Sequence, residues 1–176
     1  EEELTDYNRA FMNTGYFNRK YMARADYQGS GGDPSHNFPR NFMDIRYADV
    51  LLMAAEVWLA DNPGKAAGYL SQVRTRSLGA AAAKTTITLD DIYHERRVEF
   101  GGEGLRKWDL LRRGLDYAGS KVNASFNIPA GTPNASDFTP RTFKADTWGM
   151  IPIPASEIRN MNSGVLQQMV PAYIGL

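Results

Sequence analysis

The sequence predicts a mainly α-helical protein built from tetratricopeptide-like helical hairpins with long irregular loops. Two observations lead to this fold class. Apolar residues recur at helical spacing from about residue 44 to residue 113. Stretches rich in Gly, Pro, Asn and Ser separate and follow these helical patterns. The chain lacks the self-similarity of about 34 residues that true tetratricopeptide repeats show, so only the hairpin architecture is predicted.

The first hairpin is predicted between residues 44 and 79. Its first helix ends at the turn residues 61–64, and its second begins at about Pro63, a favourable first-turn residue, and ends at Gly79. The apolar stripes are Ala48, Leu51, Leu52, Ala55 and Leu59 in the first helix and Ala66, Ala67, Leu70 and Val73 in the second. Because the connection is so short, the two helices must pack antiparallel.

Two further helices are predicted before the chain becomes irregular. Thr88 and Asp91 have the spacing of a capping box, with Asp in the usual place of Glu, so a third helix should run from there to about Phe100. A short fourth helix follows the glycine-rich turn, over about residues 105–113. The segment beyond Gly114, to about residue 147, is expected to be a long surface excursion with little regular structure. An extended stretch at 151–154 then leads into one short helix.

Composition excludes several classes of function. The 176 residues suffice for one ordinary domain, and their 20 basic and 20 acidic side chains cancel, so nothing in the net charge indicates a nucleic-acid partner. The absence of cysteine excludes disulfides, thiol catalysis and cysteine-ligated metal. No apolar run approaches the roughly 18 residues of a membrane helix. The chain begins at Glu1 without an apolar signal segment, and we expect it to be a fragment or a processed chain.

Three glutamates spaced four residues apart give the sharpest hypothesis for an enzyme. On a continuous helix, Glu95, Glu99 and Glu103 would line one face within about 6 Å of one another, and retaining glycosidases hold two carboxyl groups about 5–5.5 Å apart. Arg96 and Arg106, however, stand three residues from Glu99 and Glu103. A neighbouring cation lowers the pKa of a carboxyl group, whereas a general acid needs that pKa raised.

We therefore interpret these charges as a structural ion-pair motif and predict no catalytic residue. The motif comprises Arg46, Glu56, Glu95, Arg96, Glu99, Glu103, Arg106 and Asp109. His36 and His94 lack the His-Glu-x-x-His spacing of a zinc site, so no metal is predicted. The glycine run at 101–104 lacks the Gly-Lys-Ser/Thr ending of a phosphate loop, and we predict a tight turn there and no cofactor.

Several stretches in a fixed order closely resemble the SusD/RagB family. The first joins Phe38-Pro39-Arg40 to the helix Asp-Ile-Arg-Tyr-Ala-Asp-Val-Leu-Leu-Met-Ala-Ala-Glu at 44–56, and matches follow at 73–76, 92–110 and 151–154. The resemblance spans about residues 38–160. It divides the chain into a variable lead-in segment, 1–37, and a SusD/RagB-type carboxyl-terminal domain, 38–176.

This resemblance implies a tetratricopeptide-containing lipoprotein exposed on the outer membrane of Bacteroidetes. Such a protein captures an oligosaccharide or peptide without catalysis and delivers it to a SusC-like TonB-dependent transporter. Family members are several hundred residues long, so this chain would be the later part of one. Contact with the membrane would then be made only through a lipid anchor outside this chain.

Exposed aromatic rings are the candidate ligand contacts, because sugars stack their C–H faces on such rings. Tyr16, Tyr21 and Tyr27 precede the family motifs, and Trp148 precedes the extended stretch. For each of them the alternative is that the ring packs in the core and contacts no ligand. Trp108 is predicted to lie in the core. Two other functions remain open from the sequence. They are a generic tetratricopeptide-like protein-interaction module, and a glycosidase that uses Glu95 or Glu99.

Overall fold

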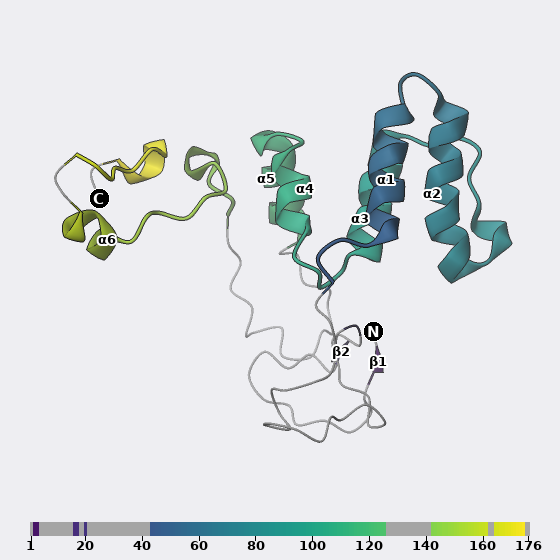
Figure 1. Cartoon of the computed structure of the whole chain (residues 1–176), viewed down its shortest axis with the longest axis horizontal. Coiled ribbons are helices and arrows are strands. Elements are labelled where there is room, and N and C mark those ends of the chain that lie inside the picture. The colour runs from purple at the N-terminus through teal and green to yellow at the C-terminus, as the bar shows by residue number, and fades with distance from the viewer. Residues whose placement is uncertain are drawn as a thin grey trace. The chain divides into compact units, whose positions relative to one another are not determined.

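The computed structural model describes residues 2–3, 16–17, 20, 43–125, 142–161 and 164–174. The chain forms two compact units, drawn in Figure 1. The first unit comprises residues 18–106 together with residue 1, and the second comprises residues 2–17 and 107–176. The predicted boundary between residues 37 and 38 is a division by family motif and remains a prediction.

The first unit is built around the predicted hairpin, formed by α1 (Tyr47–Trp58) and α2 (Pro63–Leu78). Figure 1 shows the two helices side by side, joined by one short loop. The Asn62 side chain caps α2 by accepting a hydrogen bond of 3.0 Å from the Lys65 backbone N–H, and Pro63 occupies the first helical turn. Gly79 ends α2 with a φ of +82°, a conformation that glycine adopts without steric cost. Both predicted helices are confirmed, and the bounds of α2 are as predicted, whereas α1 begins at Tyr47, three residues later than expected.

α3 (Leu89–Glu99) follows the short 3₁₀ helix η3 (Ala80–Ala82) and packs against both helices of the hairpin. The predicted capping box is present. The Thr88 hydroxyl accepts from the Asp91 backbone N–H at 3.2 Å, and the Asp91 carboxylate accepts from the Thr88 backbone N–H at 2.8 Å. The Lys84 ammonium also donates to Asp91. These bonds fix where α3 begins, and therefore which of its residues face the hairpin.

The core of this unit consists of the predicted apolar stripes and of one face of α3. Leu52, Leu70 and Ile92 are its largest fully buried side chains. Phe100, the residue that follows the last turn of α3, also belongs to this core. The opposite face of α1 is also apolar: Tyr47, Val50, Met53 and Val57 follow one another at helical spacing and are exposed.

The second unit contains shorter elements. α4 (Arg106–Leu111) starts at the last residue of the first unit, and α5 (Leu115–Ser125), η5 (Ala145–Thr147), α6 (Ala155–Asn160) and η6 (Pro171–Tyr173) follow. Two strands of two residues, β1 (Glu2–Glu3) and β2 (Tyr16–Phe17), pair antiparallel with Glu2 opposite Phe17. Residues 151–154 are extended and α6 begins after Pro154, as predicted.

The expectation of little regular structure beyond Gly114 is wrong for its first part, because α5 occupies residues 115–125. Gly114, at a φ of +99°, turns the chain out of α4. Leu115, Ala118 and Val122 then recur at helical spacing, and Ala118 is buried. Gly119, Ser120 and Asn123 of this helix obscure the pattern in the sequence, but packing of the Ala118 face outweighs their low helix propensity.

The observed architecture is mainly α, as predicted, and the tetratricopeptide-like character of the hairpins remains a prediction. In the described ranges, no helix combines the length and apolar character needed to cross a bilayer. The charged motif is positioned mainly by the beginning of α1 and by the ends of α2 and α3.

Candidate functional site

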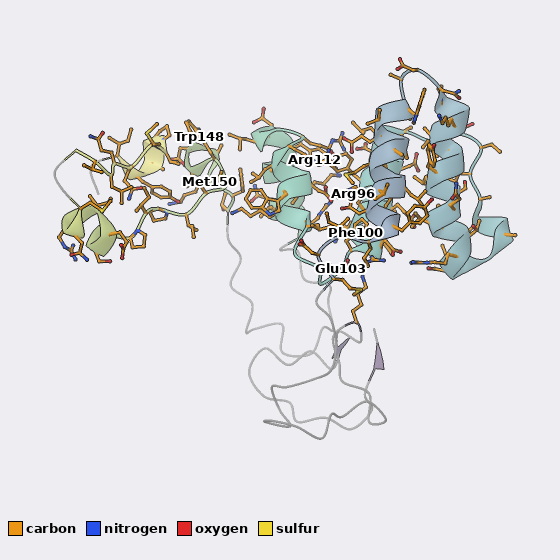
Figure 2. The ribbon with its side chains drawn as sticks, in the orientation of Figure 1. Arg96, Phe100, Glu103, Arg112, Trp148 and Met150 are labelled. Carbon is orange, nitrogen blue, oxygen red and sulfur yellow. The ribbon has the colours of Figure 1, made fainter. Side chains whose placement is uncertain are left out.

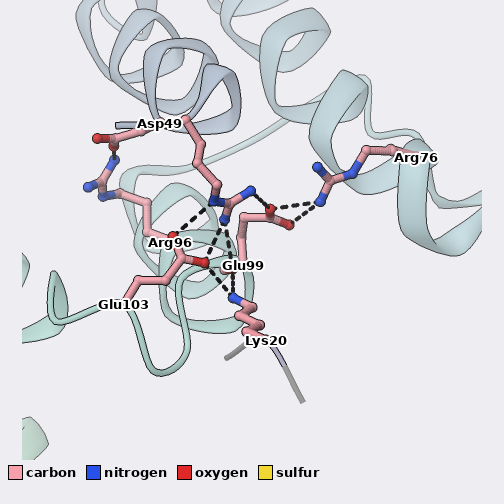
Figure 3. Close-up of polar contacts among 7 residues, drawn as sticks. Lys20, Asp49, Arg76, Arg96, Glu99 and Glu103 are labelled. Carbon is pink, nitrogen blue, oxygen red and sulfur yellow. Dashed lines mark hydrogen bonds and ion pairs between the residues drawn. The ribbon is translucent and has the colours of Figure 1, made fainter. Parts of the chain in front are cut away.

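The predicted ion-pair motif is organised around Arg46, the residue immediately before α1. Its Nε and Nη2 donate to the two oxygens of Glu103 at 2.9 Å each, which is bidentate recognition of a carboxylate. Its Nη1 donates to Oε1 of Glu99 at 2.7 Å. Figure 3 shows the polar contacts around the two carboxylates, with Glu99 and Glu103 labelled. One arginine thus joins the beginning of α1 to the end of α3 and to the turn that follows it.

Two further cations complete this cluster. Nη2 of Arg76, near the end of α2, donates to both oxygens of Glu99 at 2.7 and 2.8 Å. Lys20 donates to Oε1 of Glu103 at 2.7 Å and also to the backbone carbonyl of Glu99. The side chains of Glu103 and Glu99 are only 4% and 9% exposed. We call Lys20, Arg46, Arg76, Glu99 and Glu103 the central ion cluster.

Two other pairs link the same helices. Arg96 of α3 donates to Asp49 of α1 at 2.6 Å, and Arg74 of α2 donates to Glu95 of α3 at 2.6 Å. The guanidinium of Arg96 lies 5.1 Å from the centre of the Phe100 ring, so its charge also meets an aromatic face. Figure 2 shows Arg96, Phe100 and Glu103 in this part of the molecule. Each helix of the unit is therefore charge-linked to at least one other.

Three residues of the predicted motif remain, one on α1 and two on α4. The Tyr93 hydroxyl donates to Glu56 at 3.1 Å, which again joins α3 to α1. Asp109 is buried on α4 and accepts from Arg112 at 3.4 Å. Arg106 is the first residue of α4 and is half-buried.

Sequence spacing did not identify the partners that the structure brings together. The expected neighbours were Arg96 for Glu99 and Arg106 for Glu103, on the assumption of one continuing helix. α3 ends at Glu99, and Glu103 lies in the turn beyond it. Glu99 and Glu103 are instead bonded to residues from elsewhere in the sequence, namely Lys20, Arg46 and Arg76. The only sequence signal for Asp49, Arg74 and Arg76 was their place in family-like stretches, and Lys20 carried none.

The electrostatics of the cluster favour the charged states of Glu103 and Arg46. Burial alone would raise the pKa of Glu103, but hydrogen bonds from Arg46 and Lys20 and their positive charges outweigh it, so the pKa of Glu103 is lowered. Burial alone would likewise lower the pKa of Arg46, and the bonds to Glu103 and Glu99 raise it above its ordinary value. Glu103 and Arg46 therefore remain an ion pair throughout the physiological pH range.

The two glutamates of the glycosidase hypothesis are both engaged as ion-pair partners. Oε2 of Glu95 accepts from Arg74, and both oxygens of Glu99 accept from arginines. These carboxylates border a cavity of about 390 Å³ in the first unit, together with Lys20, Arg46 and Arg76. In the described ranges, no group of three or more His, Cys, Asp or Glu residues is arranged to hold a metal ion.

Among the predicted aromatic contacts, Trp148 is the one whose side chain the structure describes. It is 47% exposed and has a φ of +51°, the only positive φ of a non-glycine residue in the described ranges. Figure 2 shows Trp148 and Met150 in the carboxyl-terminal part. Tyr21 and Tyr27 lie outside the described residues, and for Tyr16 the structure gives only its backbone, in β2.

The Trp148 turn is held by backbone hydrogen bonds on both sides. The Trp148 N–H donates to the Ala145 carbonyl at 3.0 Å, and the Met150 N–H donates to the Thr147 carbonyl at 2.9 Å. Gly149 follows with a φ of +67°, and a Cβ added there would lie 2.5 Å from Cδ2 of Leu111. Trp148 is thus held in a left-handed conformation within a hydrogen-bonded turn, and strain of this kind often accompanies functional sites.

The prediction that Trp108 lies in the core is wrong, because its side chain is 56% exposed. On the short helix α4 the buried positions are Asp109 and Leu110, and Trp108 lies on the open side with the Lys107 ammonium 5.2 Å from its ring centre. Spacing from Leu105 and Leu111 suggested burial because it assumed one continuous apolar face along α4.

These observations define a class, a mainly α-helical protein whose hairpin is braced by interhelical ion pairs. The comparison with known families gives the identity within that class: the family model described as the SusD family matches residues 2–173. The chain belongs to the SusD family. This match begins well before the first motif recognised in the sequence and so includes the segment taken as a variable lead-in.

Curated relatives agree with this assignment. A SusD-like protein of Bacteroides ovatus is 40% identical over 79 residues, which are 43% of this chain and 14% of that protein. SusD-like protein P25 of Formosa agariphila is 35% identical over 105 residues, 56% of this chain and 20% of its own length. SusD-like protein P2 of the same organism is 26% identical over 159 residues, 82% of this chain.

The chain therefore spans between 14% and 29% of the length of these relatives. No solved structure matches the chain closely.

Proposed function

We propose that the chain is part of a binding protein that captures glycan or peptide nutrients at the outer-membrane surface, for delivery to a TonB-dependent transporter. The observation that carries this proposal is the SusD family match over residues 2–173. Transporter delivery, cell-surface exposure and a lipid anchor outside this chain follow from what the family resemblance implies. The partners are accordingly an oligosaccharide or peptide and a SusC-like transporter.

We further propose that this capture involves no catalysis. The support is the bonding of Glu95 and Glu99 to arginines at 2.6–2.8 Å, which commits both carboxylates to bracing α3 against its neighbours. A glycosidase needs one carboxyl group that holds a proton to give to the leaving oxygen. Glu95 and Glu99 instead serve as hydrogen-bonded partners of arginines, and replacing either with Gln should lower stability and remove no turnover.

The proposed ligand contacts are aromatic, and Trp148 is the best supported of them. It is about half exposed, the turn that holds it is fixed by hydrogen bonds, and Leu111 leaves no room for a side chain at the neighbouring Gly149. A rigid, exposed ring is the platform on which a sugar face stacks with little loss of entropy. Tyr16, Tyr21 and Tyr27 remain proposed contacts of the same kind.

A binding screen tests this function. Neutral and charged oligosaccharides and short peptides are titrated into the chain while tryptophan fluorescence is followed, and each mixture is assayed for newly formed reducing ends. We expect saturable binding without turnover. Trp148→Ala should weaken binding about threefold to tenfold, since a ring contact contributes roughly 0.5–1.5 kcal/mol.

Trp108→Ala is the matched control, because Trp108 is a comparably exposed tryptophan of the same unit. Sustained turnover that Glu95→Gln or Glu99→Gln abolishes would contradict non-catalytic capture. Equal loss of binding in the two tryptophan variants would contradict the role of Trp148.

A further inference from the structure

We propose that the cavity beside the central ion cluster is a second sugar subsite, which takes one neutral, hydroxyl-rich ring. This inference rests on the proposed capture function and extends it to a place where no aromatic residue is involved. The cavity measures about 390 Å³, within the range of roughly 300–1,000 Å³ that small-molecule sites occupy. It lies between the ends of α2 and α3.

Three polar groups at this cavity have hydrogen-bonding capacity to spare. In the described part of the chain, no hydrogen bond engages Nε or Nη1 of Arg76, the hydroxyl of Ser77, or Oε1 of Glu95. Arg76 offers N–H donors, Glu95 offers an acceptor, and Ser77 offers both. The Arg76 side chain is 56% exposed, so its free N–H groups are accessible from solvent.

The arrangement of these groups suits a hydroxyl. Arg76 is bonded to Glu99, and Glu95 precedes Glu99 by one turn of α3, so donor and acceptor lie about one helical turn apart. A sugar hydroxyl donates and accepts at a single oxygen, and neighbouring hydroxyls on a ring can engage both groups together. In a peptide group the nitrogen donates and the carbonyl oxygen accepts, and these two atoms point in opposite directions. Hydroxyls therefore fit the observed spacing better.

The charge balance of the cavity selects against ionic ligands. Three cations, Lys20, Arg46 and Arg76, line it with three anions, Glu95, Glu99 and Glu103. A charged sugar would be attracted by one set of charges and repelled by the other, so it gains no net attraction to offset the loss of its hydration, whereas a neutral sugar loses less. The apolar side chains of Met43, Leu78 and Val98 also line the cavity and can contact the C–H face of a ring.

A titration followed by nuclear magnetic resonance tests this subsite in the full chain. The probes are glucose, galactose, mannose and xylose, with glucuronate and glucosamine as charged counterparts of glucose and triglycine as a peptide. We expect at least one neutral sugar to shift the backbone signals of Ser77, Leu78 and Val98 in a saturable way. Glucuronate, glucosamine and triglycine should shift them less.

Variants then separate the subsite from the rest of the protein. Arg76→Met and Ser77→Ala should each weaken the neutral sugar roughly twofold to tenfold, as expected for the loss of one hydrogen bond. Arg97→Met is the control, because Arg97 is an exposed arginine of α3 that does not line the cavity. Arg76 and Ser77 are both exposed, so we expect both variants to fold, and circular dichroism checks this.

The outcomes distinguish the subsite from the broader function. Glycan binding that Trp148→Ala weakens and Arg76→Met leaves unchanged would reject the subsite and retain the capture function. Signal shifts by glucuronate or triglycine that exceed those by every neutral sugar would also reject the subsite. If no glycan or peptide binds the chain at all, both proposals fail.

Discussion

At the scale of single residues, Arg46 joins the beginning of α1 to the end of α3 and to the turn that follows. Its guanidinium makes bidentate bonds to Glu103 and a further bond to Glu99. A buried ion pair adds little net stability over an apolar substitute, because desolvation offsets the attraction, but removal of one partner leaves an uncompensated charge. We therefore expect the cluster to specify how α1 meets α3 more than to strengthen the fold.

Arg46→Met should lower the free energy of unfolding by about 3 kcal/mol, the cost of leaving buried carboxylates without their main partner. Urea denaturation followed by circular dichroism measures the change. The control is Arg97→Met, an exposed arginine on α3, which should change stability by less than about 0.5 kcal/mol. A similar small change for Arg46→Met would show that Lys20 and Arg76 suffice to neutralise the cluster.

The lowered pKa of Glu103 predicts a dependence of stability on acid. The unfolded chain titrates Glu at about 4.3, and the folded chain holds the pKa of Glu103 below the ordinary value. The stability from this ionisation is therefore present above about pH 4.3 and is lost as pH falls through the folded pKa. Glu103→Gln should be less stable than the unsubstituted chain at pH 7, and this difference should shrink at about pH 3. If the difference in stability between the two chains is the same at pH 7 and at about pH 3, the lowered pKa of Glu103 is contradicted.

At the scale of elements, the sequence predicted the helices well where several local signals agreed. Asn62, Pro63 and Gly79 marked the ends of α2, and Thr88 with Asp91 marked the beginning of α3. α5 was missed because its residues have low helix propensity and only tertiary packing of Ala118 reveals its buried face. Local rules cannot supply information that lies in packing.

The turn between η5 and the extended stretch gives a prediction at this scale. Gly149→Ala would place a methyl group 2.5 Å from Leu111 and force alanine into a positive φ. Gly164→Ala is the matched control, since its φ of +85° imposes the same backbone strain while the nearest atom, in Gln167, is 3.8 Å away. Gly149→Ala should therefore cost about 1–3 kcal/mol more in thermal unfolding, the range for overpacking. Equal losses would mean that Leu111 moves aside freely.

At the scale of the whole molecule, the sequence predicted the family and the mainly α class but not the network that joins the helices. The charged residues at 95–103 were recognised as paired, yet Glu99 takes its partners from residues 46 and 76. Such contacts depend on how the helices pack, and a single sequence contains no direct record of packing. The same reason explains why Trp108 was placed in the core while its ring is exposed.

The second apolar face of α1 has a practical consequence for anyone who produces this chain in isolation. This face exposes an apolar surface to water, formed by Tyr47, Val50, Met53 and Val57. Exposed apolar surfaces promote self-association as the protein concentration rises. Val57 is 73% exposed and lies in the last turn of α1, where a cation is favoured by the helix dipole. Val57→Lys should raise the concentration at which light scattering first detects aggregates and should leave the melting temperature unchanged. If that concentration does not change, the surface that mediates self-association is not this face of α1.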